Sequence, residues 1–157
     1  MSVTTSSPNV SLDRLLRQVR SLLRTHRLPR PTHLFLSTRS RSASLAFATG
    51  TPAARLEAVL LWSLHLEGIT ISWGHQIAGE LTVSASGRTS SGITVQAGTT
   101  AGVAEVGGRL RNRTVAEVAG TFRLAVGTTD TLTCEELARV VTAARTATGR
   151  ALEGAAA

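Results

Sequence analysis

The sequence lacks lysine and tyrosine altogether and has a single cysteine, Cys134. One cysteine excludes an intrachain disulfide and leaves no cysteine cluster from which a structural zinc site is built. Aromatic residues make up only 3% of the chain, whereas sequence-specific binding of single-stranded nucleic acid relies on aromatic stacking. No apolar run reaches the ~20 residues that a membrane-spanning helix needs. Residues 1–8 hold neither a basic nor an apolar segment, so we expect no secretory signal, no transmembrane segment and a cytoplasmic location.

Known catalytic motifs are also missing. There is no nucleophile elbow, phosphate-binding loop or dinucleotide fingerprint. Cys134 falls at a predicted helix start, where a thiolate is favoured, but two glutamates follow it and favour the alternative of a small, half-buried residue. The histidines show no metal-ligand spacing on a common helix face; they are His26, His33, His65 and His75. We therefore assign no catalytic, metal-binding or cofactor-binding residues. A non-enzymatic protein is favoured, and the alternative that stays open is an enzyme with a pocket between helix and sheet, in which His65, His75 or Cys134 would lie beside a carboxylate.

Positive charge dominates the composition. Seventeen basic residues, all arginine, face ten acidic ones, which gives a formal net charge of +7. That charge attracts nucleic acid, acidic proteins and anionic membranes alike and does not select among them. The wealth of alanine, glycine, threonine and arginine is typical of GC-rich coding sequence, so the use of arginine in place of lysine carries no functional weight.

The stretch from Thr51 to Thr99 predicts the core of the fold. Thr51-Pro52 is a helix start, because the hydroxyl caps the first turn and proline has no N–H to lose there. The helix that follows, to Leu66, is apolar on several sides, which is typical of burial on more than one face. Alternating apolar and polar residues then predict an antiparallel meander of three strands, at 69–73, 81–85 and 93–97.

The N-terminal side of this stretch has its own pattern. Residues 1–10 are expected to be a disordered tail, and an amphipathic helix follows over 11–25. Two prolines stiffen a linker at 28–31. Strands are predicted at 32–38 and 42–49, and we expect them to join the meander in a single sheet, since an isolated hairpin is marginal in water.

The C-terminal side is less regular. Residues 100–129 predict a strand, a short capped helix and another strand, at 103–110, 114–117 and 121–126. A clearer capping box, Thr133–Glu136, starts a C-terminal helix that is expected to end near Gly149. Residues 151–157 are expected to form a frayed tail.

Together these elements predict an α+β fold. An antiparallel sheet of about five strands packs against the central helix, with the N- and C-terminal helices around it. Residues 11–150 are expected to form a single domain, because a chain of this length buries about two-thirds of its unfolded surface. Both tryptophans and all three phenylalanines fall in apolar runs or on alternating faces, so all of them are expected in the core.

Arginines gather on two predicted surfaces. On helix 11–25 they lie opposite a leucine and valine stripe and form a basic face of Arg14, Arg17, Arg20, Arg24 and Arg27. This face is either solvated or a surface for phosphates or an acidic partner. A membrane surface is the third reading, although the stripe lacks the bulky aromatics of interfacial helices. The second group is Arg109, Arg111 and Arg113, which recur at every second residue. On a strand these three side chains would share one face, whereas in a loop the spacing has no meaning.

The core segments also resemble a family pattern, in which a helix ends in an apolar-tryptophan cluster, a short strand contains a tryptophan, and a later strand closes in Gly-Arg. The segments are Leu60-Leu61-Trp62, Ile69–Trp73, Leu81–Arg88 and Gly92–Val95. They are similar to a group of small uncharacterised proteins of high-GC bacteria, some of them carried on phages or mobile elements. The resemblance covers about residues 56–97, implies no catalytic residues, and implies an accessory protein.

We therefore expect a non-enzymatic interaction or assembly module, whose partner is another protein or a second copy of itself. The resemblance implies an accessory protein of a phage or mobile element. The alternative is nonspecific binding of nucleic acid or another polyanion through the arginine face, which would be sensitive to salt.

Overall fold

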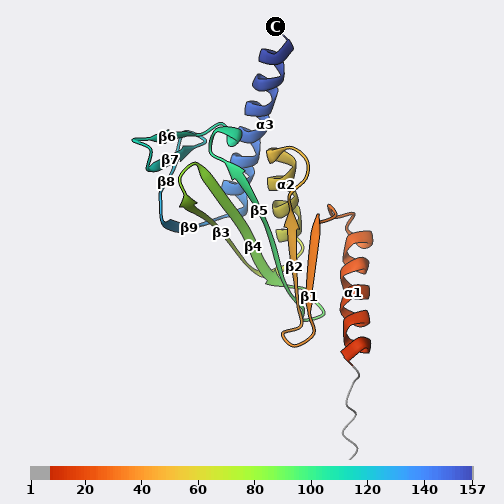
Figure 1. Ribbon diagram of the computed structural model, residues 1–157. Helices are drawn as coiled ribbons and strands as arrows, with labels where there is room; N and C mark the ends of the chain where they lie inside the picture. Colours follow the sequence, from red (N-terminus) through yellow and green to blue (C-terminus); the bar gives the residue numbers. More distant parts are fainter. Residues whose placement is uncertain (1–7, 157) are drawn as a thin grey trace, which may run out of the picture.

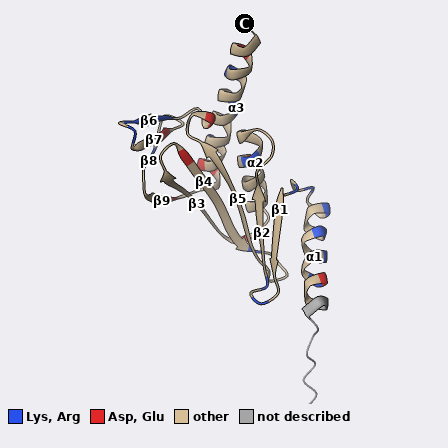
Figure 2. Ribbon diagram, viewed as in Figure 1, with Lys and Arg blue, Asp and Glu red and all other residues tan. Residues whose placement is uncertain are grey.

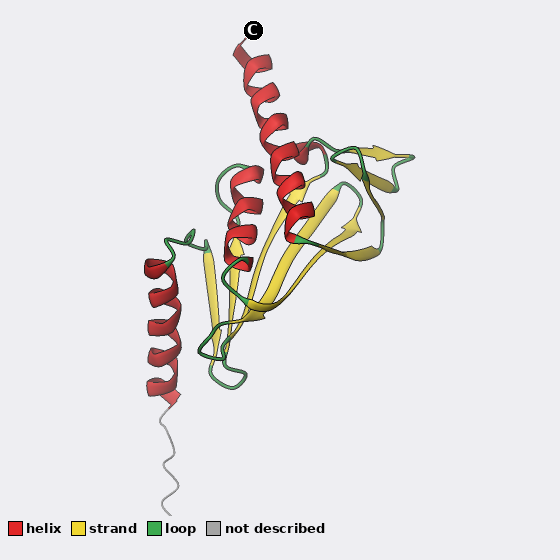
Figure 3. Cartoon of the chain, turned by 180° about the vertical axis from the view of Figure 1, so that it is seen from behind, coloured by secondary structure: helices red, strands yellow, loops and turns green. Residues whose placement is uncertain are grey.

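The structure is a computed structural model that describes residues 8–156, with side chains described from Ser11 onward. Its main layer is a six-stranded sheet, and α2 (Pro52–Ser63) and α3 (Cys134–Ala156) lie over one face of that sheet (Figure 1, Figure 3). The first helix, α1 (Pro8–Thr25), stands beside the edge of the sheet. A separate three-stranded sheet lies at the other end. The predicted α+β fold is confirmed.

The main sheet is larger than predicted, and it is mixed. In spatial order its strands are β1 (His33–Ser37), β2 (Ser42–Phe47), β5 (Thr94–Gly102), β4 (Glu80–Arg88), β3 (Glu67–Ile77) and β9 (Thr128–Leu132). Neighbouring strands are antiparallel except β2 and β5, which are parallel. The chain crosses the sheet through α2 after β2, so β3 runs in the same direction as β2. The meander then brings β5 back beside β2.

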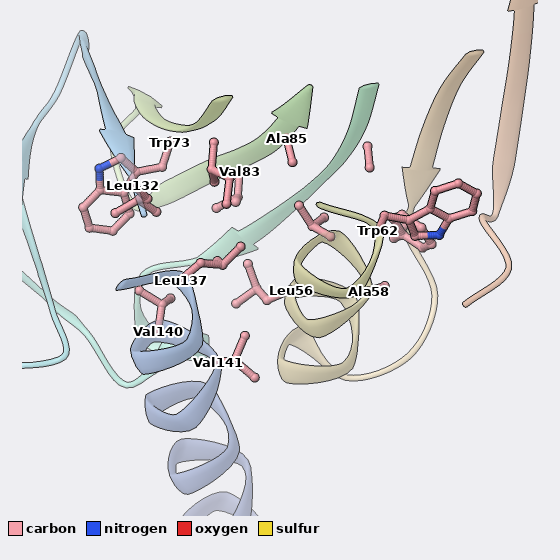
Figure 4. Close-up of a cluster of buried hydrophobic side chains, with 14 of the residues drawn as sticks. Leu56, Ala58, Trp62, Trp73, Val83, Ala85, Leu132, Leu137, Val140 and Val141 are labelled. Carbon is pink, nitrogen blue, oxygen red and sulfur yellow. The ribbon is translucent and has the colours of Figure 1, made fainter. Parts of the chain in front are cut away.

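The core lies between α2, α3 and the covered face of the sheet. Figure 4 shows Leu56 and Trp62 of α2 and Leu137 of α3 facing the strands. The central helix is buried on several sides, as its sequence predicts, and the Trp62 indole N–H donates to the Pro29 carbonyl oxygen at 2.9 Å. This bond ties the predicted linker to the core. One core prediction is wrong: Phe35 lies on the open face of the edge strand β1 and is 67% exposed.

The predicted caps of α2 and α3 are both present, whereas the predicted end of α3 is wrong. Thr51 Oγ1 accepts a hydrogen bond from the Ala54 N–H at 3.2 Å before α2. The Thr133 hydroxyl and the Glu136 carboxylate cap α3 reciprocally, at 3.1 and 2.8 Å. The predicted end of α3 near Gly149 is wrong, because the helix continues to Ala156. No glycine cap or proline stops it there, and a lone glycine costs a helix only about 1 kcal/mol.

The two termini differ from the predicted tails. The predicted tail 1–10 falls partly outside the described residues, and α1 already includes residues from Pro8. The predicted frayed segment 151–157 is helical as far as Ala156, and its described side chains are exposed. None of the helices in the described part of the chain is long and apolar enough to cross a membrane.

Residues 100–129 contain the main errors of the sequence interpretation. The predicted strand 103–110 is a 3-10 turn, η1 (Ala104–Val106), followed by a short strand, β6 (Arg109–Arg111). The predicted capped helix at 114–117 is a strand, β7 (Val115–Val118), because Ala116 and Val118 alternate into the core. The strand ends at a turn in which Ala119 and Gly120 both have positive φ. The predicted strand 121–126 is confirmed as β8 (Phe122–Ala125). These strands form the small sheet in the order β6-β7-β8.

Candidate polyanion-binding surfaces

The first surface is the arginine face of α1. Leu15 and Val19 are buried against the sheet side of the helix, so the amphipathic pattern fixes which face is covered. The predicted arginines are all exposed: Arg14, Arg17, Arg20 and Arg24 lie on α1, and Arg27 lies in the turn that follows it. The five are called the α1 arginines below. Six ion pairs occur in the described part of the chain, and none involves an α1 residue. The positive charge on α1 is therefore not neutralised by described carboxylates at close range.

Three of these arginines form a continuous stripe. Arg17, Arg20 and Arg24, with Ser21 between them, line a shallow hollow of about 500 Å³ along the helix. Asp13 lies at one end of the hollow and is its only acidic residue. Residues three and four apart are neighbours on a helix, at a rise of about 5 Å per step. The stripe therefore presents guanidinium groups in a row.

The second surface is on the small sheet. Glu117 of the central strand β7 lies directly opposite Arg109 of β6 and Arg123 of β8. Its carboxylate accepts a hydrogen bond from Arg109 Nε at 3.1 Å and one from Arg111 Nη1 at 3.4 Å, and Arg123 Nε lies 3.6 Å away. The hydrogen bond from Arg109 lowers the pKa of Glu117, against a smaller opposing effect of desolvation.

The structure separates the two predicted groups of arginine. Figure 2 shows the blue residues of α1 at one end of the molecule and those of β6 at the other. Arg109 and Arg111 share one strand and converge on Glu117, as the alternating spacing allows, whereas Arg113 lies in the turn after β6. Arg123 was missed from the sequence, since only the pairing of β7 with β8 brings it to Glu117.

The other residues with chemical potential are occupied structurally. Both ring nitrogens of the fully buried His75 are hydrogen-bonded to backbone groups. His65 does not meet His75; it stacks on His26 with ring centroids 4.1 Å apart. Cys134 is half-buried, with its Sγ 3.8 Å from Ser63 Oγ. Within residues 8–156, no three side chains of His, Cys, Asp or Glu gather in a way that could hold a metal ion.

Comparison with known proteins adds no identification. No protein-family model, curated protein or solved structure shows significant similarity to this chain. The resemblance to small proteins of high-GC bacteria and mobile elements therefore stays a prediction, and functional inference depends on the two surfaces themselves.

Proposed function

We propose that the protein is a non-enzymatic interaction module whose partner is polyanionic, and that the arginine face of α1 is the binding surface. The observation that carries the proposal is a contrast between arginines. Arginines of the small sheet, α2 and α3 include members paired with carboxylates. In contrast, the four arginines on α1 and Arg27 just after it are all exposed and free of ion pairs in the described structure. A cytoplasmic location and a role on a mobile element are part of the same prediction.

The stripe suits phosphate better than a particular base sequence. Guanidinium groups bind phosphate oxygens in a bidentate manner, and each contact releases counterions from a nucleic acid. Both tryptophans are buried, with Trp62 fully and Trp73 almost fully excluded from solvent, so neither is free to stack on a base. Binding is therefore expected to depend on charge density and salt and to depend weakly on sequence.

A filter-binding titration with a short DNA duplex at low salt tests this proposal. The variant to compare is the one in which the five α1 arginines are replaced by glutamine, which keeps the side-chain length and removes the charge. The matched control also replaces five exposed arginines, all of them away from α1: Arg39, Arg41, Arg88, Arg139 and Arg150. We expect the α1 variant to lose affinity by at least about tenfold and the control to change much less. Equal losses in the two variants would refute a specific role of α1.

Self-association is the second candidate, because one observation favours it. The edge strand β1 is apolar, and its Phe35 is 67% exposed. Leu34 and Leu36 on the other face of β1 pack on the core, so the uncovered part of this edge strand is the face with Phe35. An exposed apolar side chain on an edge strand favours contact with another chain. Light scattering of the wild-type protein and of Phe35→Arg tests this candidate, with Leu152→Arg as the control, because Leu152 is 68% exposed on α3. A dimer that only Phe35→Arg dissociates supports it, and a monomer at all concentrations contradicts it.

A further inference from the structure

We infer that the three-stranded sheet carries a second, separate binding site, which takes phosphate groups, either of a free oligophosphate or of a nucleic-acid backbone. The site consists of Arg109, Arg111 and Arg123, with Glu117 at its base, and Arg113 lies in the adjoining hairpin turn. It goes beyond the function proposed for α1, because the small sheet and α1 lie at opposite ends of the molecule (Figure 2). Failure of one site would therefore leave the other intact.

The first argument is the number of unused donors. The Glu117 side chain is only 13% exposed, whereas those of Arg109, Arg111 and Arg123 are 84%, 61% and 68% exposed. Each guanidinium has five N–H donors. Within the described structure, Arg109 and Arg111 each give one hydrogen bond to Glu117, and Arg123 gives none. Most of the donors therefore lack a protein acceptor, although the carboxylate holds all three groups together.

The second argument is the balance of charge. Three guanidiniums lie within ion-pair distance of one carboxylate, so the group keeps two positive charges. A terminal phosphoryl group carries a charge of about −1.5 to −2 and three acceptor oxygens, and two adjacent phosphodiesters of a nucleic-acid backbone carry one negative charge each. Either ligand matches that excess better than a second carboxylate would, because one carboxylate neutralises only half of it. Glu117 then serves to position the arginines and does not compete with the ligand for every donor.

The third argument is the backbone at the tip of the β6–β7 hairpin. Asn112 and Arg113 both have positive φ, 51° and 62°, and the Thr114 N–H donates to the Arg111 carbonyl oxygen at 3.1 Å. This is a two-residue turn in which the second position favours glycine. The next hairpin has that glycine, Gly120, at φ +71°. Arginine at the equivalent position carries a conformational cost and adds a positive charge in the hairpin turn that follows Arg111.

The fourth argument is space. A hollow of about 780 Å³ adjoins the arginines and is bounded by Gly107, Gly120 and Phe122. Ligand sites in proteins commonly have volumes of about 300–1,000 Å³, so an oligophosphate fits without rearrangement of the sheet. Phe122 also packs edge-on against Trp73, with ring centroids 5.7 Å apart. The wall of the hollow is therefore anchored to the core of the main sheet.

Isothermal titration of the full chain with inorganic tripolyphosphate at low ionic strength tests the site. To separate it from α1, the titration uses a protein in which the five α1 arginines are glutamine. We expect this protein to bind the probe, and Arg111→Gln with Arg123→Gln to weaken binding by about 10- to 100-fold, as expected for lost charge-assisted hydrogen bonds. Arg139→Gln is the control, because Arg139 is similarly exposed and pairs with a single glutamate on α3; its affinity should not change.

A further variant separates binding from folding. Arg113→Gly relieves the positive-φ strain, so it should raise the melting temperature by about 2 °C while it weakens tripolyphosphate binding. A short oligonucleotide and a hexa-aspartate peptide complete the set of probes. Binding of tripolyphosphate or of the oligonucleotide supports the site and identifies the source of the phosphoryl group. Binding of neither, equal binding of the aspartate peptide, or unchanged affinity in the Arg111/Arg123 variant would overturn the inference.

Discussion

His75 of β3 donates a hydrogen bond from Nδ1 to the carbonyl oxygen of Leu124 on β8, at 2.9 Å. The Gly79 N–H donates to the other ring nitrogen, Nε2, at 3.0 Å, so Nε2 carries no proton. The proton of the ring is therefore on Nδ1, which makes Nδ1 the donor to Leu124. The ring is fully buried. The imidazole thus connects the main sheet to the small sheet, which carries Glu117 and the three arginines around it. Its bond to Gly79 also closes the β3–β4 turn.

Replacement of His75 by phenylalanine should therefore be costly. The substitution keeps an aromatic ring but leaves the Leu124 carbonyl and the Gly79 N–H without their partner, and each unsatisfied buried group costs about 1–3 kcal/mol. We expect urea unfolding to show a loss of about 2–4 kcal/mol in the free energy of unfolding. His33→Phe, at an exposed position on β1, should change it by less than about 0.5 kcal/mol. Similar losses in both variants would argue against the structural role of His75.

The two buried tryptophans should respond differently to the same substitution. The Trp62 N–H has an acceptor, the Pro29 carbonyl oxygen at 2.9 Å, whereas the buried Trp73 N–H has no partner in the described structure. Both substitutions lose packing. Trp62→Phe loses a hydrogen bond in addition, whereas Trp73→Phe removes a buried polar group that has no partner, which offsets part of its cost. Chemical denaturation should show Trp62→Phe to be less stable than Trp73→Phe by at least about 1 kcal/mol. The reverse order would mean that the Trp73 indole has a partner in solution.

The Glu117 ion pairs should make stability depend on pH. The hydrogen bond from Arg109 lowers the pKa of Glu117 below its ordinary value of 4.5 in the folded protein. A carboxyl that is more acidic when folded adds stability that is fully present above pH 4.5 and is lost as the pH falls through the lower folded-state pKa. Thermal melts from about pH 6 to pH 3 should therefore show a fall in wild-type stability that is smaller in Glu117→Gln. The control is Glu80→Gln, since Glu80 is exposed and outside the ion pairs described; parallel wild-type and Glu117→Gln curves would contradict the prediction.

Local signals in the sequence were sufficient for the larger elements. Thr51-Pro52 and the Thr133–Glu136 box each satisfy the free N–H groups of a helix start, so both caps could be predicted and both are present. The strands of the meander bury every second side chain, as in β4, where Leu81, Val83 and Ala85 are all inside. Such periodicity depends only on which face meets the core.

Elements that depend on distant partners were not predictable in this way. The strand β9 buries only its last residue, Leu132, so its sequence has no alternation, and it forms because β3 offers a free edge. The capping pattern at Thr114 misled because local hydrogen bonding competes with strand pairing, and pairing with β6 and β8 prevails there. For the same reason Arg123 could not be assigned to the Glu117 group before the register of the small sheet was known.

The salt dependence of duplex binding tests the central claim most directly. Each arginine that contacts a phosphate contributes about −0.9 to the slope of log K against log salt concentration. If α1 is the binding surface, replacement of Arg17, Arg20 and Arg24 by glutamine should make the slope less negative by about 3. The same number of substitutions at Arg39, Arg41 and Arg88 should leave the slope within about 1 of the wild-type value. An unchanged slope in the α1 variant, or no measurable duplex binding by the wild-type protein at low salt, would contradict the proposed function.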